Sequence, residues 1–305
     1  MSTSPAARHI SVCICTYRRP HLLARLLQAL DCLRTDDRFT VSVVIVDNDR
    51  TESARATAMS FGGRSRMQIK YCVEPKQNIA MARNRAVAES EGELVALIDD
   101  DEFPGEDWLL RLCDTLDFSR AHGALGPVKP HFESEPPTWV VRGRFCERPS
   151  YPTGTPLRQP RQTRTGNCLL RRSILIEEPG PFDPRFGRTG GEDVDFFGRR
   201  LLQGDLFVWC DEAPVFESVP VERMTRAYFI RRALLRGVAN AEKTPLLGIG
   251  TAKSLVATLA YSVLLPALLL WRHDVFMHIL VRDCDHIGKL LAICGIRPVR
   301  ERPAA

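Results

Sequence analysis

Residues 94–102 read LVALIDDDE, five apolar residues followed at once by four acidic ones. The apolar residues do not alternate with polar ones, so 94–98 is predicted to be a strand that is buried on both faces. Adjacent carboxylates at the end of a strand repel one another unless a cation neutralises them. Hard oxygen ligands of this kind suit Mg²⁺ or Mn²⁺. An acidic turn exposed to solvent is the alternative interpretation.

Strand-like and helix-like segments alternate before this run. The predicted strands are 10–15, 41–46 and 68–73, and the predicted helices are 21–33, about 52–60 and 79–89. This alternation predicts an α/β fold with a mostly parallel sheet and flanking helices. Ligands bind beyond the carboxyl ends of strands in such sheets. Thr16, Tyr17 and Arg18 after the first strand, and Asp47 after the second, are therefore expected close to the acidic run.

A second acidic motif, Gly190-Gly191-Glu192-Asp193, precedes a predicted helix at about 192–203. The glycine pair allows a tight turn, and the helix dipole favours ionised carboxylates in the first helical turn. An ionised carboxylate that faces a cavity is a reasonable general base. Simple capping of the helix by acidic residues is the alternative. Residues 127–166, rich in Pro and Arg, are predicted to be long loops with short strands that cover one side of the site.

In this order and at these spacings, the motifs resemble the family 2 glycosyltransferases of the GT-A fold over about residues 9–220. Within that family they are most similar to exopolysaccharide enzymes of the succinoglycan-biosynthesis type. The resemblance is carried by VCICTYRRP at 12–20, DND at 47–49, NIAMARN at 78–84, DDDE at 99–102 and GEDVDFF at 191–197.

The resemblance implies roles for individual residues. Donor and nucleotide binding would use Thr16, Tyr17, Arg18, Asp47, Asn78, Arg83, Asp99 and Asp100, with the Asp47 carboxylate accepting from uracil N3–H. Asp99 and Asp101 would hold Mg²⁺ or Mn²⁺. Asp193 would be the catalytic base, and Glu192, the second catalytic residue, would hydrogen-bond the acceptor sugar. Gly190, Gly191 and Glu192 would form the acceptor side, where the glycines also let the backbone approach the donor sugar.

The implied activity is inverting, metal-dependent transfer of a sugar, with glucose as the first choice, from a UDP-sugar to an undecaprenyl-diphosphate-linked oligosaccharide in exopolysaccharide biosynthesis. Another UDP-hexose or another cell-surface polysaccharide remains open. A nucleotidyltransferase-like nucleotide-binding protein is the other alternative, disfavoured because the loop 16–20 contains no Gly. Intact acidic motifs argue against an inactive scaffold. Many relatives carry a His near 215–220, but VFESVP stands there, with Glu217 as a candidate substitute or a surface residue.

Composition and charge describe the rest of the chain. Of the 305 residues, 44% are hydrophobic and 26% charged, which excludes disordered and collagen-like chains. We predict a nucleotide-sugar-binding half at 1–125, an acceptor-binding half at 126–221 and a basic, apolar helical region at 222–305. That last region holds 13 Lys and Arg against 6 Asp and Glu, a net of +7, so the positive charge of the chain, +5 in total, is concentrated there.

The stretch Ser254–Trp271 is uncharged, is interrupted by Pro266 and has basic residues on both sides. It is predicted to associate with a membrane as an interfacial or monotopic element, with a buried soluble helix and a true span as alternatives. The 10 cysteines form no C-x-x-C pair and the N-terminus has no apolar signal core, which favours a cytoplasmic protein. The expected location is the inner face of the cytoplasmic membrane. Anionic lipid headgroups, or the phosphates of a lipid-linked acceptor, are the expected partners of the basic region, and nucleic acid is not.

Overall fold

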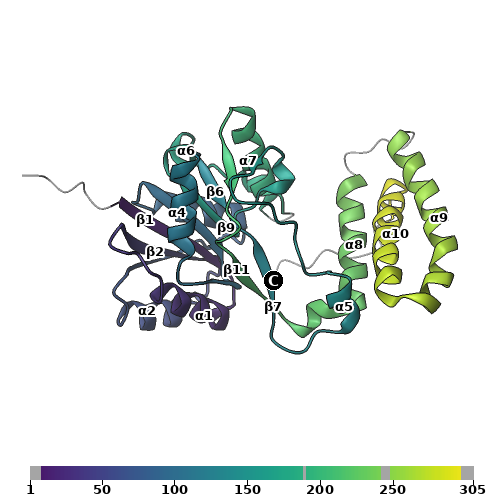
Figure 1. The fold of residues 1–305 in the computed structure, drawn as a ribbon, viewed down its shortest axis with the longest axis horizontal. Helices are drawn as coiled ribbons and strands as arrows, with labels where there is room; N and C mark the ends of the chain where they lie inside the picture. Colours follow the sequence, from purple (N-terminus) through teal and green to yellow (C-terminus); the bar gives the residue numbers. More distant parts are fainter. Residues whose placement is uncertain (1–7, 188–189, 242–247, 297–305) are drawn as a thin grey trace, which may run out of the picture. The chain divides into compact units, whose positions relative to one another are not determined.

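The computed structural model describes residues 8–187, 190–241 and 248–296. Its main feature is an eight-stranded sheet (Figure 1). The parallel part contains, in spatial order, β3 (Gln68–Val73), β2 (Phe39–Asp47), β1 (Arg8–Thr16) and β4 (Leu94–Asp99). The sheet continues through β9 (Asn167–Arg171), β6 (Gly123–Leu125), β10 (Phe207–Trp209) and β8 (Pro156–Leu157). The sheet is mostly parallel, with β9 and β8 as its antiparallel strands. This confirms the predicted fold class.

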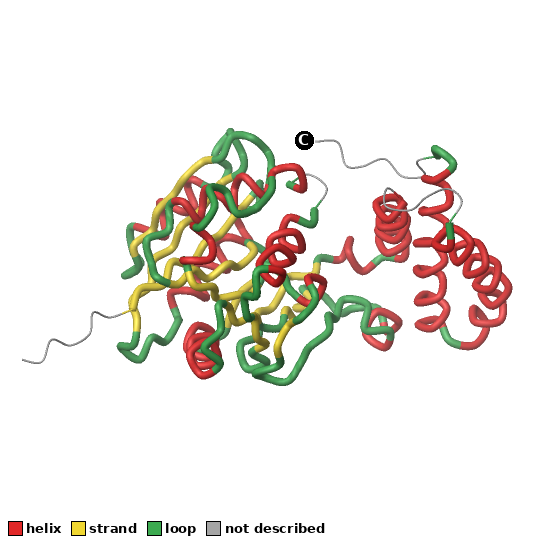
Figure 2. The backbone as a smooth tube through the Cα atoms, turned by 90° about the horizontal axis from the view of Figure 1, so that it is seen from above, coloured by secondary structure: helices red, strands yellow, loops and turns green. Residues whose placement is uncertain are grey.

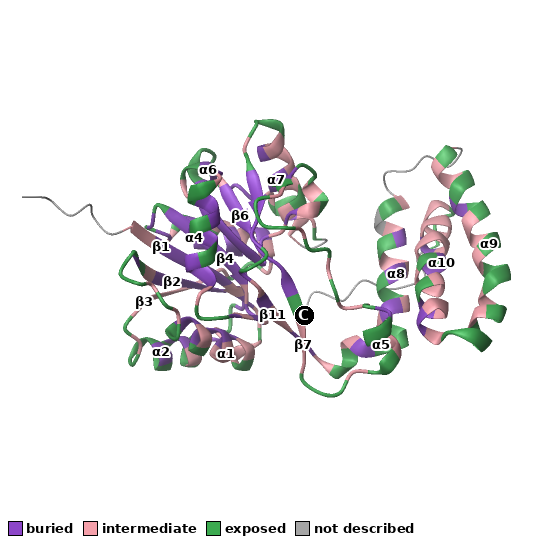
Figure 3. Cartoon of the chain, in the orientation of Figure 1, coloured by how far each residue is buried: buried purple, intermediate pink, exposed green. Residues whose placement is uncertain are grey.

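Helices cover both faces of this sheet, as the continuous apolar strands predict (Figure 2). One face packs on α1 (Pro20–Asp31), α2 (Arg55–Gly62) and α4 (Trp108–Phe118). The other packs on α3 (Ile79–Ala88), α6 (Ser173–Ile176) and α7 (Glu192–Leu202). Alternate side chains of β1 show the two layers, because Ile10, Val12 and Ile14 join the first cluster and Cys13 the second. Figure 3 shows the strands as the most continuously buried part of the chain.

The region 127–166 contains short elements joined by loops, as predicted. They include β7 (Val128–Phe132), α5 (Thr138–Arg142) and a 3-10 turn at Pro160–Gln162. A second, three-stranded sheet has the order β5 (Glu102–Pro104), β11 (Val215–Val219) and β7. The acidic run therefore lies where β4 of the large sheet leads directly into β5 of the small one.

The chain divides into two compact units, 1–129 with 148–217, and 130–147 with 218–305. All the predicted catalytic, donor, metal and acceptor residues belong to the first unit. The second contains α5, a 3-10 turn at Val221–Met224, and the helices α8 (Arg226–Ala241), α9 (Ile249–Trp271) and α10 (His273–Ile293). The assignment of 1–125 and 126–221 to donor and acceptor stays a prediction. All ten cysteines are free thiols.

The second unit has a small aromatic core of its own. Trp139 lies 5.7 Å from the ring of Phe229, and Val140 and Met224 are buried with them. Helix α10 packs against both α8 and α9. Helix α9 corrects the sequence analysis, since it begins at Ile249 and continues through Pro266. A proline inside a helix removes one backbone donor, and α9 continues through Pro266 despite that loss.

Candidate active site

The carboxyl end of β4 is held by two arginines. Arg83 donates to Asp99 at 3.0 Å, whereas Arg19 donates to both Asp100 and Asp101 at 3.1 Å. Asp100 is buried and also accepts from the Thr16 hydroxyl at 2.8 Å. Burial raises the pKa of Asp100 to about 6, against the opposing charge of Arg19. The predicted repulsion among these carboxylates is therefore relieved by guanidinium groups of the chain itself.

Arg83 connects the acidic run to the start of α7. Its guanidinium is buried and donates to Asp99 with one nitrogen and to Glu192 with another. Glu192 is only 6% exposed, and burial raises the pKa of its carboxyl group, opposed by Arg83. Among the described residues, its second oxygen is buried without a hydrogen-bond partner. Two acidic motifs that are far apart in the sequence thus share one cation.

The turn before α7 has the conformation that its glycines predict. Gly190 and Gly191 have φ values of 82° and 103°, which side chains rarely tolerate. Asp193 follows in the first turn of α7, half-buried, and one of its oxygens accepts from the Val194 amide at 2.7 Å. The helix dipole stabilises the charge of a carboxylate at this position.

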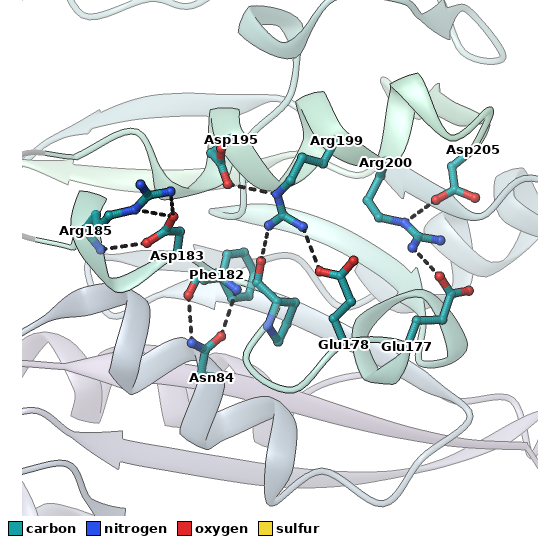
Figure 4. Close-up of polar contacts among 11 residues, drawn as sticks. Asn84, Glu177, Glu178, Phe182, Asp183, Arg185, Asp195, Arg199, Arg200 and Asp205 are labelled. Atoms are coloured by element: carbon teal, nitrogen blue, oxygen red, sulfur yellow. Dashed lines mark hydrogen bonds and ion pairs between the residues drawn. The ribbon is translucent and has the colours of Figure 1, made fainter.

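Hydrogen bonds hold the loop that leads to α7 against α3. Asn78 caps α3 by accepting from the Met81 amide at 3.1 Å, and its amide group donates to the Pro184 carbonyl at 2.8 Å. Asn84 and Phe182 exchange two hydrogen bonds, which Figure 4 shows between helix and loop. These contacts give Asn78 an architectural role in this structure, and its predicted part in donor binding stays a prediction.

The ends of β1 and β2 hold the remaining predicted donor residues. The guanidinium of Arg18 lies 5.1 Å from the ring centre of Tyr17, and its Nε donates to Asp49 at 3.1 Å. Burial alone would raise the pKa of Asp49, but hydrogen bonds from Thr51 and Arg18 outweigh it and lower that pKa to about 2. Sequence reasoning gave Asp49 no role of its own.

Asp47 is fully buried. Its carboxylate accepts from the amides of Asp49 and Ala54, at 3.0 and 2.8 Å, and from the Tyr71 hydroxyl at 2.9 Å. It therefore orders the loop between β2 and α2. Recognition of a base by Asp47 stays a prediction.

Sequence reasoning missed further charged groups at this site. Arg19 lies in the quoted motif 12–20 but received no role, although a cation in the loop beside the acidic run was a usable signal. Arg148 donates to Glu217, so this candidate substitute for a histidine is held in an ion pair. Arg164 lies half-buried close to Asp193 and Glu102. Both arginines come from the loop region 127–166. The sequence there has no periodic pattern from which the place of a side chain in the fold could be predicted.

The acidic run suits a divalent cation whose remaining ligands are water and the phosphate oxygens of a bound substrate. In the described ranges, no three His, Cys, Asp or Glu side chains already form a metal-binding cluster. Asp99 is 43% exposed at its side chain, and Asp101 lies two residues on. Mg²⁺ usually takes one or two protein carboxylates and completes its shell with water and phosphate oxygens. Asp99 and Asp101 therefore fit such an ion when a diphosphate is bound beside them.

Comparison with known proteins places this site in a family. The model of glycosyl transferase family 2 matches residues 11–178. The succinoglycan biosynthesis protein ExoM of Rhizobium meliloti (strain 1021) is 35% identical over 233 residues, 75% of this chain and 73% of that protein. The glucosyl-dolichyl phosphate glucuronosyltransferase of Haloferax volcanii is 24% identical over 193 residues, 61% of this chain and 59% of that protein.

Solved structures share the fold. The mannosyltransferase PcManGT of Pyrobaculum calidifontis, in complex with GDP-Man and Mn²⁺, has a TM-score of 0.62 at 17% identity, over 94% of this chain and 88% of that one. TarS 1–349 of S. aureus in complex with UDP has a TM-score of 0.55 at 15% identity, over 94% and 90% of the two chains. With the family model over more than half of the sequence, these findings establish that the chain belongs to the family 2 glycosyltransferases and has the GT-A fold.

Proposed function

We propose that this enzyme is an inverting, metal-dependent glycosyltransferase that moves a sugar from a UDP-sugar to a lipid-linked oligosaccharide in exopolysaccharide synthesis. The observation that carries the proposal is the bridge of Arg83 between Asp99 and Glu192. It places the start of α7, with Asp193, beside the carboxylates suited to a diphosphate-bound cation. A base and a leaving-group site are thereby brought within reach of one substrate.

The chain's own residues support a single displacement. Asp193 would take the proton from an acceptor hydroxyl as that oxygen attacks the anomeric carbon, and Glu192 would orient the acceptor. Asp99 and Asp101 would hold a divalent cation, which stabilises the charge that develops on the departing diphosphate. One carboxylate used once inverts the anomeric centre, so an α-linked donor gives a β-linked product.

The names of the relatives support the substrate classes. ExoM is named for succinoglycan biosynthesis, and the Haloferax volcanii relative is named for transfer to a glucosyl-dolichyl phosphate. A structure of TarS in complex with UDP-GlcNAc shares the fold at a TM-score of 0.55 and 17% identity. The name of the Haloferax volcanii relative supports a lipid-linked acceptor, and the TarS complex supports a UDP-sugar donor. UDP-glucose is the first donor to test, followed by other UDP-hexoses.

A donor screen tests this proposal. The full-length protein is incubated with UDP-glucose, UDP-galactose, UDP-glucuronate or GDP-mannose and a lipid-linked oligosaccharide extract, with Mn²⁺, Mg²⁺ or EDTA. We expect UDP release with one UDP-sugar, loss of that activity in EDTA and recovery on adding Mn²⁺ or Mg²⁺. NMR of the product should show a β linkage from an α-linked donor. An α linkage, or full activity in EDTA, contradicts the mechanism.

We further propose that α9 lies on the inner face of the cytoplasmic membrane. Its length and composition would suit a membrane, and only 6% of its most apolar 18-residue segment is buried. Val256, Leu259 and Val263 are 67%, 69% and 78% exposed. The polar side of α9 faces α10 instead, where Ser254 contacts His286 at 3.2 Å and Ser262 contacts Asp283 at 3.5 Å. This division supports an interfacial helix.

Vesicle flotation checks this placement. The double variant Leu259→Lys/Val263→Lys should lose most binding to vesicles that contain phosphatidylglycerol, because two charges would enter the apolar layer. Leu202→Lys is the matched control, since Leu202 is 90% exposed on α7, outside this surface. Equal flotation of the double variant and the wild type would overturn the interfacial placement.

A further inference from the structure

A short segment of the chain, just before β9, passes against the acidic run. β9 pairs antiparallel with β4, and Asn167 is the register partner of Ile98. The residues just before β9 therefore lie beyond the carboxyl end of β4. A Cβ on Gly166 would come within 2.6 Å of Glu102 Oε1 and 3.2 Å of Asp99 Oδ2, so the backbone passes directly against these carboxylates.

Two arginines lie on this side of the site. Arg148 is paired with Glu217, which is the register partner of Glu102 across β11 and β5. Arg164 is half-buried, two residues before Gly166, and the charges of Arg148, Asp193, Glu102 and Glu217 act on it. Among the described residues, no hydrogen bond or ion pair within contact distance holds the Arg164 guanidinium. Burial, and next the charge of Arg148, lower the pKa of Arg164.

Such an arrangement is costly for an unliganded protein. A guanidinium has five donors in a planar fork, and buried polar groups are normally hydrogen-bonded. The charge of Arg148 adds repulsion, opposed by the carboxylates of Asp193, Glu102 and Glu217, of which Glu217 is already paired with Arg148. A planar fork beside a second cation is the arrangement that recognises a phosphate group in two-point contact.

We propose that Arg164, with Arg148 beside it, binds the diphosphate of a substrate at this site. The inference rests on the proposed function, because two diphosphates can reach Asp193: that of the nucleotide donor and that of a lipid-linked acceptor. Both diphosphates would present the same anionic oxygens to the guanidinium group of Arg164. The metal carboxylates Asp99 and Asp101 lie on the strand end, whereas Arg164 approaches from the covering segment 163–166.

Isothermal titration on the full-length protein tests the anion site without any turnover. Inorganic pyrophosphate, UDP and uridine are the probes, each with Mg²⁺ present. In Arg164→Met we expect pyrophosphate affinity to fall about 10- to 100-fold, as for a lost charge-assisted contact, with uridine unchanged. Arg164→Lys should recover part of the affinity. Arg161→Met, an exposed arginine three residues away, is the matched control and should bind like the wild type.

The two sources are separated by further measurements on the same variants. If the donor diphosphate occupies the site, UDP affinity falls with that of pyrophosphate. If the acceptor diphosphate does, UDP affinity is kept and KM for the lipid-diphosphate acceptor rises at least tenfold. Unchanged pyrophosphate affinity, UDP affinity and acceptor KM in Arg164→Met would refute the proposal. Pyrophosphate binding that depends on Arg164, in a protein that turns over no sugar nucleotide, would keep the anion site and reject the proposed function.

The melting temperature without ligand distinguishes binding from a structural role. Because Arg164 is half-buried and repelled by the charge of Arg148, Arg164→Met should melt at the same temperature as the wild type or higher. A residue that holds the fold together would show the reverse. Lower stability of both Arg164→Met and Arg164→Lys, with pyrophosphate affinity unchanged, would therefore count against the anion site.

Discussion

Asp193→Asn is expected to lower kcat by about 10²- to 10⁴-fold, the usual contribution of a general base. The amide keeps the shape of the side chain in the first turn of α7 but cannot accept the acceptor's proton. Affinity for UDP should stay nearly that of the wild type, because the change leaves Asp99, Asp101 and Arg83 in place. The measurement is UDP release in the presence of acceptor, together with the dissociation constant of UDP.

Asp195→Asn is the control for this change. Asp195 belongs to the same helical turn, but its carboxylate is paired with Arg199 at 3.0 Å, as Figure 4 shows. Loss of such a pair between residues four apart on a helix costs a few tenths of a kcal/mol, about 0.3–0.5. We expect nearly full turnover in this variant. If Asp193→Asn also kept near wild-type turnover, Asp193 would be excluded as the base.

Arg83→Met should have the largest effect on stability. Removing one partner of a buried ion pair leaves an uncompensated charge, which typically costs about 3–5 kcal/mol. Here the uncompensated charge costs more at Glu192, which is 6% exposed, than at Asp99, whose side chain is 43% exposed. The same change should abolish transfer, because it disconnects the acidic run from the start of α7. Urea unfolding followed by tryptophan fluorescence measures the stability.

Two further variants make the Arg83 result specific. Arg83→Met/Glu192→Gln should recover a large part of the lost free energy of unfolding, since the neutral amide no longer carries a buried charge. Arg85→Met lies on the same helix, where Arg85 is 46% exposed and paired with Glu89 at 3.1 Å. Its cost should be below about 1 kcal/mol. A cost as small in Arg83→Met would mean that the bridge does not support the site.

Much of the large sheet was predictable because its signals are local. The apolar run 94–98 corresponds to β4 at Leu94–Asp99, and 68–73 is β3 without change. Side chains on both faces of β4 meet helices, so Leu94–Ile98 are all apolar and the pattern is unambiguous. The start of α7 was equally clear, because Gly190 and Gly191 adopt a left-handed backbone and Glu192 begins the helix.

The region 127–166 and the strand β9 after it were less predictable for a physical reason. These segments are short, and they are stabilised by pairing with distant strands rather than by their own periodicity. β9 lies between β4 and β6 in the sheet although in the sequence it stands between a loop and the short helix α6. Pro266 shows the same limit, because α9 continues through a residue that is a local signal for a helix to end or kink.

The sequence by itself determined the α/β class, the strand ends that carry polar residues and the two acidic motifs, because hydrophobic spacing and glycine turns act over a few residues. Only the tertiary structure decided which charges meet. Arg83 is 16 residues from Asp99 and 109 from Glu192, yet it contacts both. The buried position of Asp47 and the approach of Arg164 to Asp193 were decided in the same way. Coulombic contacts of this kind depend on distance in space and on burial, and both are set by the path of β4, β9 and α7 rather than by spacing along the chain.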